Sequence, residues 1–113
     1  AAQKVARLSA AMAKKVNLTV RGVIENMSWF TGDDGKRYEL FGSGGGAELA
    51  AELEVPLLAQ IPLVTQLREG GDDGHPIAAI APESEAGAAF HALAAQIVAM
   101  KPKKIFSAGL KMV

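Results

Sequence analysis

Val20-Arg21-Gly22-Val23-Ile24-Glu25-Asn26-Met27-Ser28 is a short apolar run that ends in polar residues. Its β-branched side chains and polar flanks predict a largely buried strand of a parallel sheet. Asn26 falls near the carboxyl end of this strand. Ligands of open α/β sheets bind outside that end, because loops and helix termini line the crevice there. Asn26 is therefore a candidate binding residue, and the alternative is that it only caps or turns the strand end.

A second buried strand is predicted at Val55–Leu63, with a proline near each end, where a missing N–H donor is tolerated. A helix predicted over Ala47–Leu53 separates the two strands, which makes a βαβ unit with a right-handed crossover. Parallel strands share the edge at which they end. Asn26 and the segment Pro62–Leu67 are therefore expected to face one another.

The segment between the first strand and this helix predicts an inserted β-hairpin. Large residues alternate on both sides of Gly32-Asp33-Asp34-Gly35, which is typical of a tight turn between two short strands. Asp33 and Asp34 are expected to serve the turn. The glycine-rich stretch Gly42–Gly46 then leads into the helix. It is expected to be a flexible connection, and phosphate binding at the helix N-terminus is the alternative.

The remaining elements are predicted to flank the strands. Residues 2–15 have the spacing of an amphipathic helix, and Ser84 is placed to cap a final helix with one apolar stripe and an exposed His91. Gly70–Pro76 is predicted to be a loop, in which Asp72, Asp73 and His75 are more simply solvated than metal-bound. Ile77–Ala81 is predicted as an edge strand or a packing segment.

Composition limits the kinds of function. The chain has 113 residues, enough for one domain, which we expect to span residues 1–104 with a tail at 105–113. Twelve basic and twelve acidic residues cancel, so no net field favours nucleic acid or an anionic membrane. The sequence contains no cysteine and no apolar run near the roughly 20 residues of a membrane span. A cytoplasmic protein is expected.

Four ordered blocks carry a resemblance to a known family. Gly22–Ser28, Phe41–Gly46, Ile61–Leu63 and Arg68–Asp72 closely resemble the carboxy-terminal part of Mrp (ApbC)-type P-loop ATPases, which are relatives of MinD and the nitrogenase iron protein. The similarity runs from about Ala2 to Ile97. It implies an α/β fold: part of a parallel-sheet P-loop NTPase, with a βαβ unit, an inserted hairpin and flanking helices.

The resemblance also implies a function and a site. Proteins of this family carry iron–sulfur clusters, and in their relatives the residue matching Asn26 hydrogen-bonds adenine while the loop at Pro62 and Leu63 stacks on it. The implied cofactor is ATP, with Mg²⁺ in the full-length protein. The implied partners are a second copy of the chain and iron–sulfur apoproteins.

This sequence departs from the family pattern in two respects. No G-x-x-x-x-G-K-[ST] phosphate loop occurs in it, so we expect no ATP hydrolysis by the chain alone. The family commonly has Cys-x-x-Cys where this chain has Thr31-Gly32-Asp33-Asp34, and aspartate is a poor substitute for thiolate in a cluster. Two alternatives stay open: a cysteine-free relative with another cargo, and a non-catalytic α/β interaction module.

Overall fold

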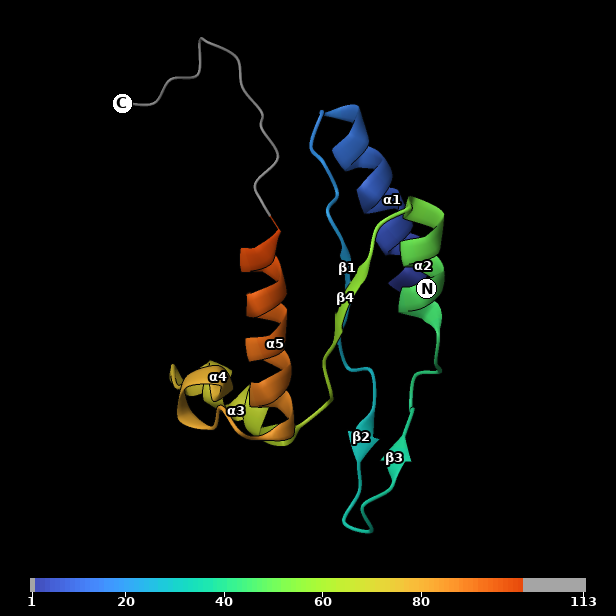
Figure 1. Cartoon of the computed structure of the whole chain (residues 1–113). Helices are drawn as coiled ribbons and strands as arrows, with labels where there is room; N and C mark the ends of the chain where they lie inside the picture. The colour runs from blue at the N-terminus through green and yellow to red at the C-terminus, as the bar shows by residue number, and fades with distance from the viewer. Residues whose placement is uncertain (1, 101–113) are drawn as a thin grey trace, which may run out of the picture.

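The computed structural model describes residues 2–100. Two parallel strands lie at its centre, with helices on both sides and a hairpin that extends beyond their carboxyl ends (Figure 1). The helices are α1 (Ala2–Lys15), α2 (Gly45–Leu53), α3 (Thr65–Asp73), α4 (Ile77–Ile80) and α5 (Glu85–Ala99), and the strands are β1 (Val23–Glu25), β2 (Phe30–Thr31), β3 (Arg37–Tyr38) and β4 (Leu57–Gln60). The α/β class and the βαβ unit are confirmed.

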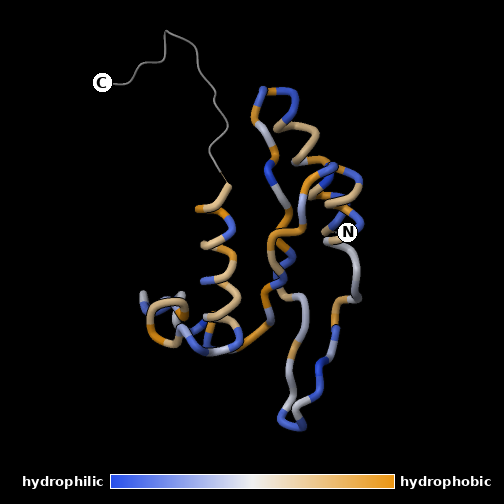
Figure 2. Tube along the Cα trace, viewed as in Figure 1, coloured by the Kyte–Doolittle hydropathy of each residue, from blue (hydrophilic) through white to orange (hydrophobic). Residues whose placement is uncertain are grey.

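β1 and β4 pair in parallel, with Ile24 opposite Ala59 and Glu25 opposite Gln60. Both strands are shorter than the sequence predicted. At the start of the pair, the N–H of Val23 donates to the carbonyl of Pro56, and the regular ladder begins only after an irregularity between Val23 and Ile24. Figure 2 shows hydrophobic residues along this pair, which agrees with the apolar runs that predicted it.

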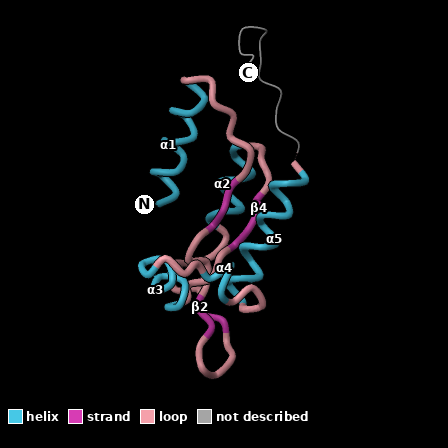
Figure 3. Tube along the Cα trace, turned by 90° about the vertical axis from the view of Figure 1, so that its left-hand side faces the viewer, coloured by secondary structure: helices cyan, strands magenta, loops and turns pink. Residues whose placement is uncertain are grey.

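The predicted hairpin is confirmed as the antiparallel pair β2 and β3, with Phe30 opposite Tyr38. The N–H of Gly32 donates to the carbonyl of Lys36, and Gly35 has a φ of 77°, a left-handed conformation that glycine adopts without strain. Figure 3 shows the hairpin extending beyond the ends of β1 and β4, away from α1.

α2 covers one side of the strand pair, and α5 covers the other (Figure 1). Leu49 and Ala50 of α2 are buried. α2 begins two residues earlier than predicted. Gly44 adopts a left-handed conformation at the N-terminus of α2, and Gly45 and Gly46 are therefore helical. The prediction of α1 is confirmed, and a bidentate ion pair between Arg7 and Glu52 joins it to α2, with an Nε–Oε2 distance of 2.7 Å.

Between β4 and α5, one prediction is wrong and one pair of alternatives is decided. Gly70-Gly71-Asp72-Asp73 continues α3, which ends at Gly74 with a φ of 75°, because a left-handed glycine here closes the helix rather than opening a loop. Of the two alternatives for Ile77–Ala81, the packing segment is confirmed: its first four residues form the single turn α4, with Ile77 packed into the core at 2% exposure.

The final helix is confirmed. The side-chain oxygen of Ser84 accepts a 3.1 Å hydrogen bond from the N–H of Gly87, as an N-cap does. Ala86 and Leu93 lie on the apolar side of this helix and are buried, whereas Ile97 is half exposed. His91 is exposed as predicted, and its Nε2 lies 2.8 Å from the carbonyl oxygen of Ala78. No helix among residues 2–100 is long and apolar enough to cross a membrane. The predicted boundary at 104 and the tail lie outside the described residues.

Candidate functional site

The segments that follow β1 and β4 remain side by side after the strands end. The N–H of Ile61 donates to the carbonyl of Glu25 at 2.8 Å, and the N–H of Ser28 returns a 2.9 Å hydrogen bond to the carbonyl of Ile61. Farther along, the N–H of Leu63 donates to the carbonyl of Trp29 at 2.7 Å. These bonds bring the segment that contains Asn26 next to the segment that contains Pro62, as the shared edge of parallel strands predicts.

Asn26 turns the end of β1 and is exposed. Its Oδ1 accepts a 2.9 Å hydrogen bond from the N–H of Met27, whose φ of 53° is left-handed. This contact gives the side-chain oxygen the capping role that the sequence left open. The described residues provide no acceptor for the Asn26 amide nitrogen, so a donor remains available at the strand end. Nearby, Pro62 is buried and Leu63 is half-buried.

Glu25 is the most connected side chain of this edge. Its Oε1 accepts hydrogen bonds from Ser28 Oγ at 2.7 Å and from Gln60 Nε2 at 2.8 Å, and its Oε2 accepts one from the N–H of Gly46 at 2.9 Å. The hydrogen bonds from Gln60 and Ser28, with that from Gly46, lower the pKa of the Glu25 carboxyl against the opposing effect of burial. The ionised carboxylate also complements the positive end of the α2 dipole.

The Glu25 side chain packs against the glycine-rich stretch Gly42–Gly46 at the start of α2. A Cβ atom at Gly46 would lie 2.9 Å from the Cβ of Glu25, so the close approach requires glycine. Because the Gly46 N–H already binds a carboxylate, the α2 N-terminus does not present that group to a phosphate. The geometry therefore favours the connecting role that the sequence analysis preferred.

The hairpin is held by contacts of its own. Asp34 accepts hydrogen bonds from the Tyr38 hydroxyl and from the N–H of Lys36, which lower the pKa of the Asp34 carboxyl and raise that of Tyr38. Asp34 thus serves the turn, as predicted. At the base of the hairpin, Glu85 accepts hydrogen bonds from the Trp29 indole and from Thr31 Oγ1 at 3.0 Å.

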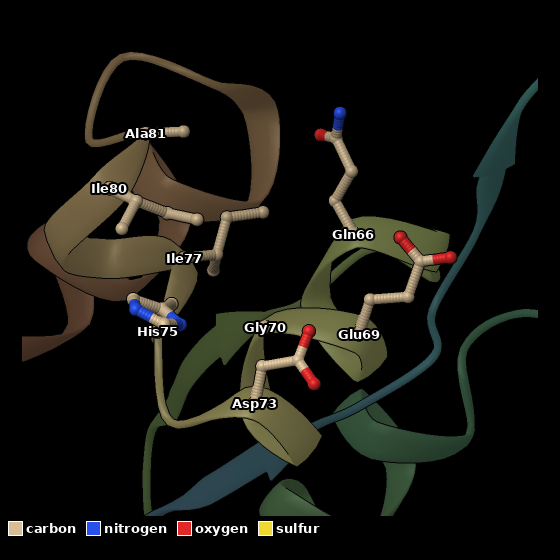
Figure 4. A pocket seen from close by; sticks show the side chains of 8 residues that line it. All are labelled: Gln66, Glu69, Gly70, Asp73, His75, Ile77, Ile80 and Ala81. Carbon is tan, nitrogen blue, oxygen red and sulfur yellow. The ribbon is translucent and has the colours of Figure 1, made fainter.

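A separate cavity of about 280 Å³ lies between α3 and α4 (Figure 4). Gln66, Glu69 and Asp73 line it from α3, and the opposite wall includes Ile77 and Ile80. Among residues 2–100, no three potential ligands come together as a metal site. The predicted metal alternative at residues 72, 73 and 75 therefore finds no support in the described geometry.

Sequence reasoning did not assign roles to two carboxylates that organise this edge. Glu25 stands within the motif that carried the resemblance, but its contact with Gly46 spans 21 residues, so no local pattern could have suggested it. Glu85 at the first position of α5 gave no local signal either, because its partners Trp29 and Thr31 lie more than 50 residues away.

The residues present fit the adenine part of a nucleotide and not its phosphates. Asn26 supplies an amide, a group that offers a purine edge both a donor and an acceptor. The neighbouring Leu63 is half-buried and supplies apolar surface, whereas Pro62 is fully buried and leaves no surface for a ligand. A phosphate loop with its lysine is absent from the sequence, and one N–H of the α2 N-terminus, that of Gly46, is bonded to Glu25.

Comparisons with known proteins agree with this arrangement. A family model described as ParA, NUBPL iron-transfer P-loop NTPase, matches residues 1–98. An iron–sulfur cluster carrier protein from Synechocystis is 47% identical over 94 residues, and the alignment covers 81% of this chain and 27% of the relative. A protein of the same name from Saccharolobus solfataricus is 39% identical over 87 residues, covering 76% of this chain and 29% of the relative.

A solved structure is also similar. It is a nucleotide-binding protein from Archaeoglobus fulgidus in complex with ADP, with a TM-score of 0.52 and 32% sequence identity. The similarity covers 59% of this chain and 28% of that one. The chain thus spans a little more than a quarter of the length of these relatives.

Proposed function

Because the chain belongs to the ParA family of NUBPL-type iron-transfer P-loop NTPases, we propose that it supplies the adenine side of a nucleotide site in an ATP-binding protein of iron–sulfur cluster transfer. One observation carries the proposal. The segments after β1 and β4 stay hydrogen bonded to each other, which holds Asn26 beside Pro62 and Leu63 at the carboxyl edge of the strands.

In this proposal, the Asn26 amide binds the purine edge while Leu63 and the adjoining turn contact the ring face. Asn26 Oδ1 already accepts the Met27 N–H, so the amide is held in place before a ligand arrives. A preoriented side chain loses less conformational freedom on binding. ATP is the energy source when it is bound in the whole protein. Residues outside this edge bind its phosphates and Mg²⁺.

The proposed setting follows from the relatives' names. Synechocystis and Saccharolobus proteins that are called iron–sulfur cluster carriers suggest that the cargo is a cluster and that the partners are apoproteins that receive it. A homodimer in the cytoplasm is the arrangement we propose for the whole protein.

A second candidate rests on one specific observation, which is the absence of cysteine from all 113 residues. A relative that uses the same nucleotide edge but moves another cargo, or that serves only as an interaction module, needs no thiolate in the hairpin. A cluster carrier and a relative with another cargo would both bind nucleotide at the carboxyl edge of β1 and β4, here called the nucleotide edge (Asn26, Pro62 and Leu63). An interaction module would not bind nucleotide there.

Nucleotide titration followed by NMR tests the proposal directly. ADP added to ¹⁵N-labelled chain is expected to shift the amide resonances of residues 26–29 and 61–64, and to leave those of the exposed end of α1 unchanged. GDP is the matched control, because its purine edge has a different donor and acceptor pattern. Equal shifts with ADP and GDP, or no shift at these residues, would contradict adenine binding here.

A further inference from the structure

The Glu25 carboxylate joins three segments that the sequence keeps apart. Its partners are Ser28 after β1, Gln60 at the end of β4, and Gly46 at the start of α2. All three donate a hydrogen to it. A carboxylate only accepts, so it satisfies the three donors together, whereas an amide of the same shape would place its own NH₂ group against one of them.

The hydrogen bond to Gly46 links Glu25 to the segment that connects the hairpin to α2. Residues 39–44 lead from β3 to α2, and two glycines of this connection, Gly42 and Gly44, have positive φ values. The Glu25–Gly46 hydrogen bond ties the end of this connection to the end of β1. Because Gly46 has no side chain, its backbone also lies close to the Glu25 side chain.

We propose that Glu25 is a positioning residue that couples the nucleotide edge to the hairpin. The inference rests on the proposed function, because it concerns the same strand end. Glu25 precedes Asn26, and its backbone carbonyl accepts the Ile61 N–H while its carboxylate holds Gly46. A ligand that moves Asn26 therefore also moves the Glu25 carboxylate. That carboxylate in turn moves Gly46 and the segment between β3 and α2.

The first test uses ADP and compares two variants by NMR. In the wild-type chain, ADP is expected to move the amide resonances of Asn26, of Gly46 and of residues 40–42 with one common dissociation constant. In Glu25→Gln, Asn26 is expected to respond still, while residues 40–42 lose at least half of their shift. Glu52→Gln is the matched control, since that carboxylate pairs with Arg7 on the exposed side of α2.

A second test needs neither nucleotide nor substitution. When the pH is lowered, protonation of Glu25 removes an acceptor, and the Gly46 amide is expected to shift with a midpoint below the ordinary carboxyl range. Residues 40–42 are expected to follow the same midpoint. Glu39 and Glu48 also lie near this connection, and Glu39→Gln and Glu48→Gln separate their titrations from that of Glu25.

The outcomes are distinct. Residues 40–42 that respond to ADP equally in wild type and Glu25→Gln, or that titrate independently of Gly46, would overturn the coupling. Absence of any ADP response at Asn26 in the wild type would overturn the proposed function instead, and the pH titration then decides the coupling by itself. A variant that does not fold leaves the wild-type pH titration as the deciding measurement.

Discussion

The N–H of Leu63 donates a 2.7 Å hydrogen bond to the carbonyl oxygen of Trp29, beyond the last residue of each central strand. It extends the contact between the two chain segments as far as the base of the hairpin. Because backbone bonds hold both segments, the position of Asn26 relative to Pro62 is set by the main chain and not by side-chain packing alone.

Asn26→Ala is expected to weaken ADP binding about tenfold. The loss corresponds to about 1 to 2 kcal/mol, the effect of leaving a hydrogen-bonding group of the bound adenine without its partner. NMR titration or calorimetry measures it, with Asn17→Gly as the control, because Asn17 lies in the turn after α1 and has a left-handed φ of 63° that glycine tolerates. An unchanged affinity for ADP would restrict Asn26 to its capping role.

Glu25→Gln is expected to destabilise the fold at neutral pH by about 1 kcal/mol, a value kept low because the carboxylate is only partly buried. The folded-state pKa of Glu25 is lowered, so its contribution is present above the unfolded pKa and is lost as the pH falls through the folded value. Urea unfolding at neutral and acidic pH should show the difference between wild type and variant shrinking in acid. A difference that grows in acid would show that another group is responsible.

Anaerobic reconstitution of the wild-type chain with iron and sulfide is expected to give no stable iron–sulfur absorbance, because the sequence has no thiolate and Asp34 is engaged by Tyr38. The double variant Thr31→Cys/Asp34→Cys restores the Cys-x-x-Cys spacing and is expected to gain such absorbance. Thr31→Cys alone is the control. Stoichiometric absorbance in the wild type would refute the expectation.

Two adjacent glycines of α3 are expected to respond oppositely to alanine. A Cβ at Gly70 would lie 2.4 Å from the carbonyl oxygen of His75, whereas one at Gly71 meets nothing within 4 Å. Gly70→Ala should therefore destabilise the chain by about 1 to 3 kcal/mol through overpacking. Gly71→Ala should stabilise it by up to about 1 kcal/mol through helix propensity. Thermal unfolding of both variants decides the matter, and equal effects would contradict the packing at His75.

The purified chain is expected to self-associate through the side of β1 that carries α1. Val5, Leu8 and Met12 of α1 are each about 60% exposed, and a groove of about 450 Å³ runs between α1 and β1. Apolar surface of this kind favours association. Light scattering over a dilution series should show a concentration-dependent mass that Leu8→Gln lowers, with Val98→Gln on α5 as the control. A strictly monomeric mass at tens of micromolar would disprove it.

The sequence by itself determined the local elements of this protein. Two apolar runs separated by a helix predicted the βαβ unit, the Asp-Gly turn predicted the hairpin, and Ser84 predicted the start of α5, because each signal lies within a short stretch of sequence. The shared edge of parallel strands also predicted that the segments after β1 and β4 would lie side by side.

Only the tertiary structure decided where each element ends and which side chains join the elements. The glycines at positions 70 and 71 predict a loop, because glycine favours turns, yet these residues are helical and the backbone of His75 packs against Gly70. The Glu25 carboxylate finds Gly46 after 21 residues and Gln60 after 35. Contacts over such distances depend on how the whole chain is packed, and no local pattern of residues encodes them.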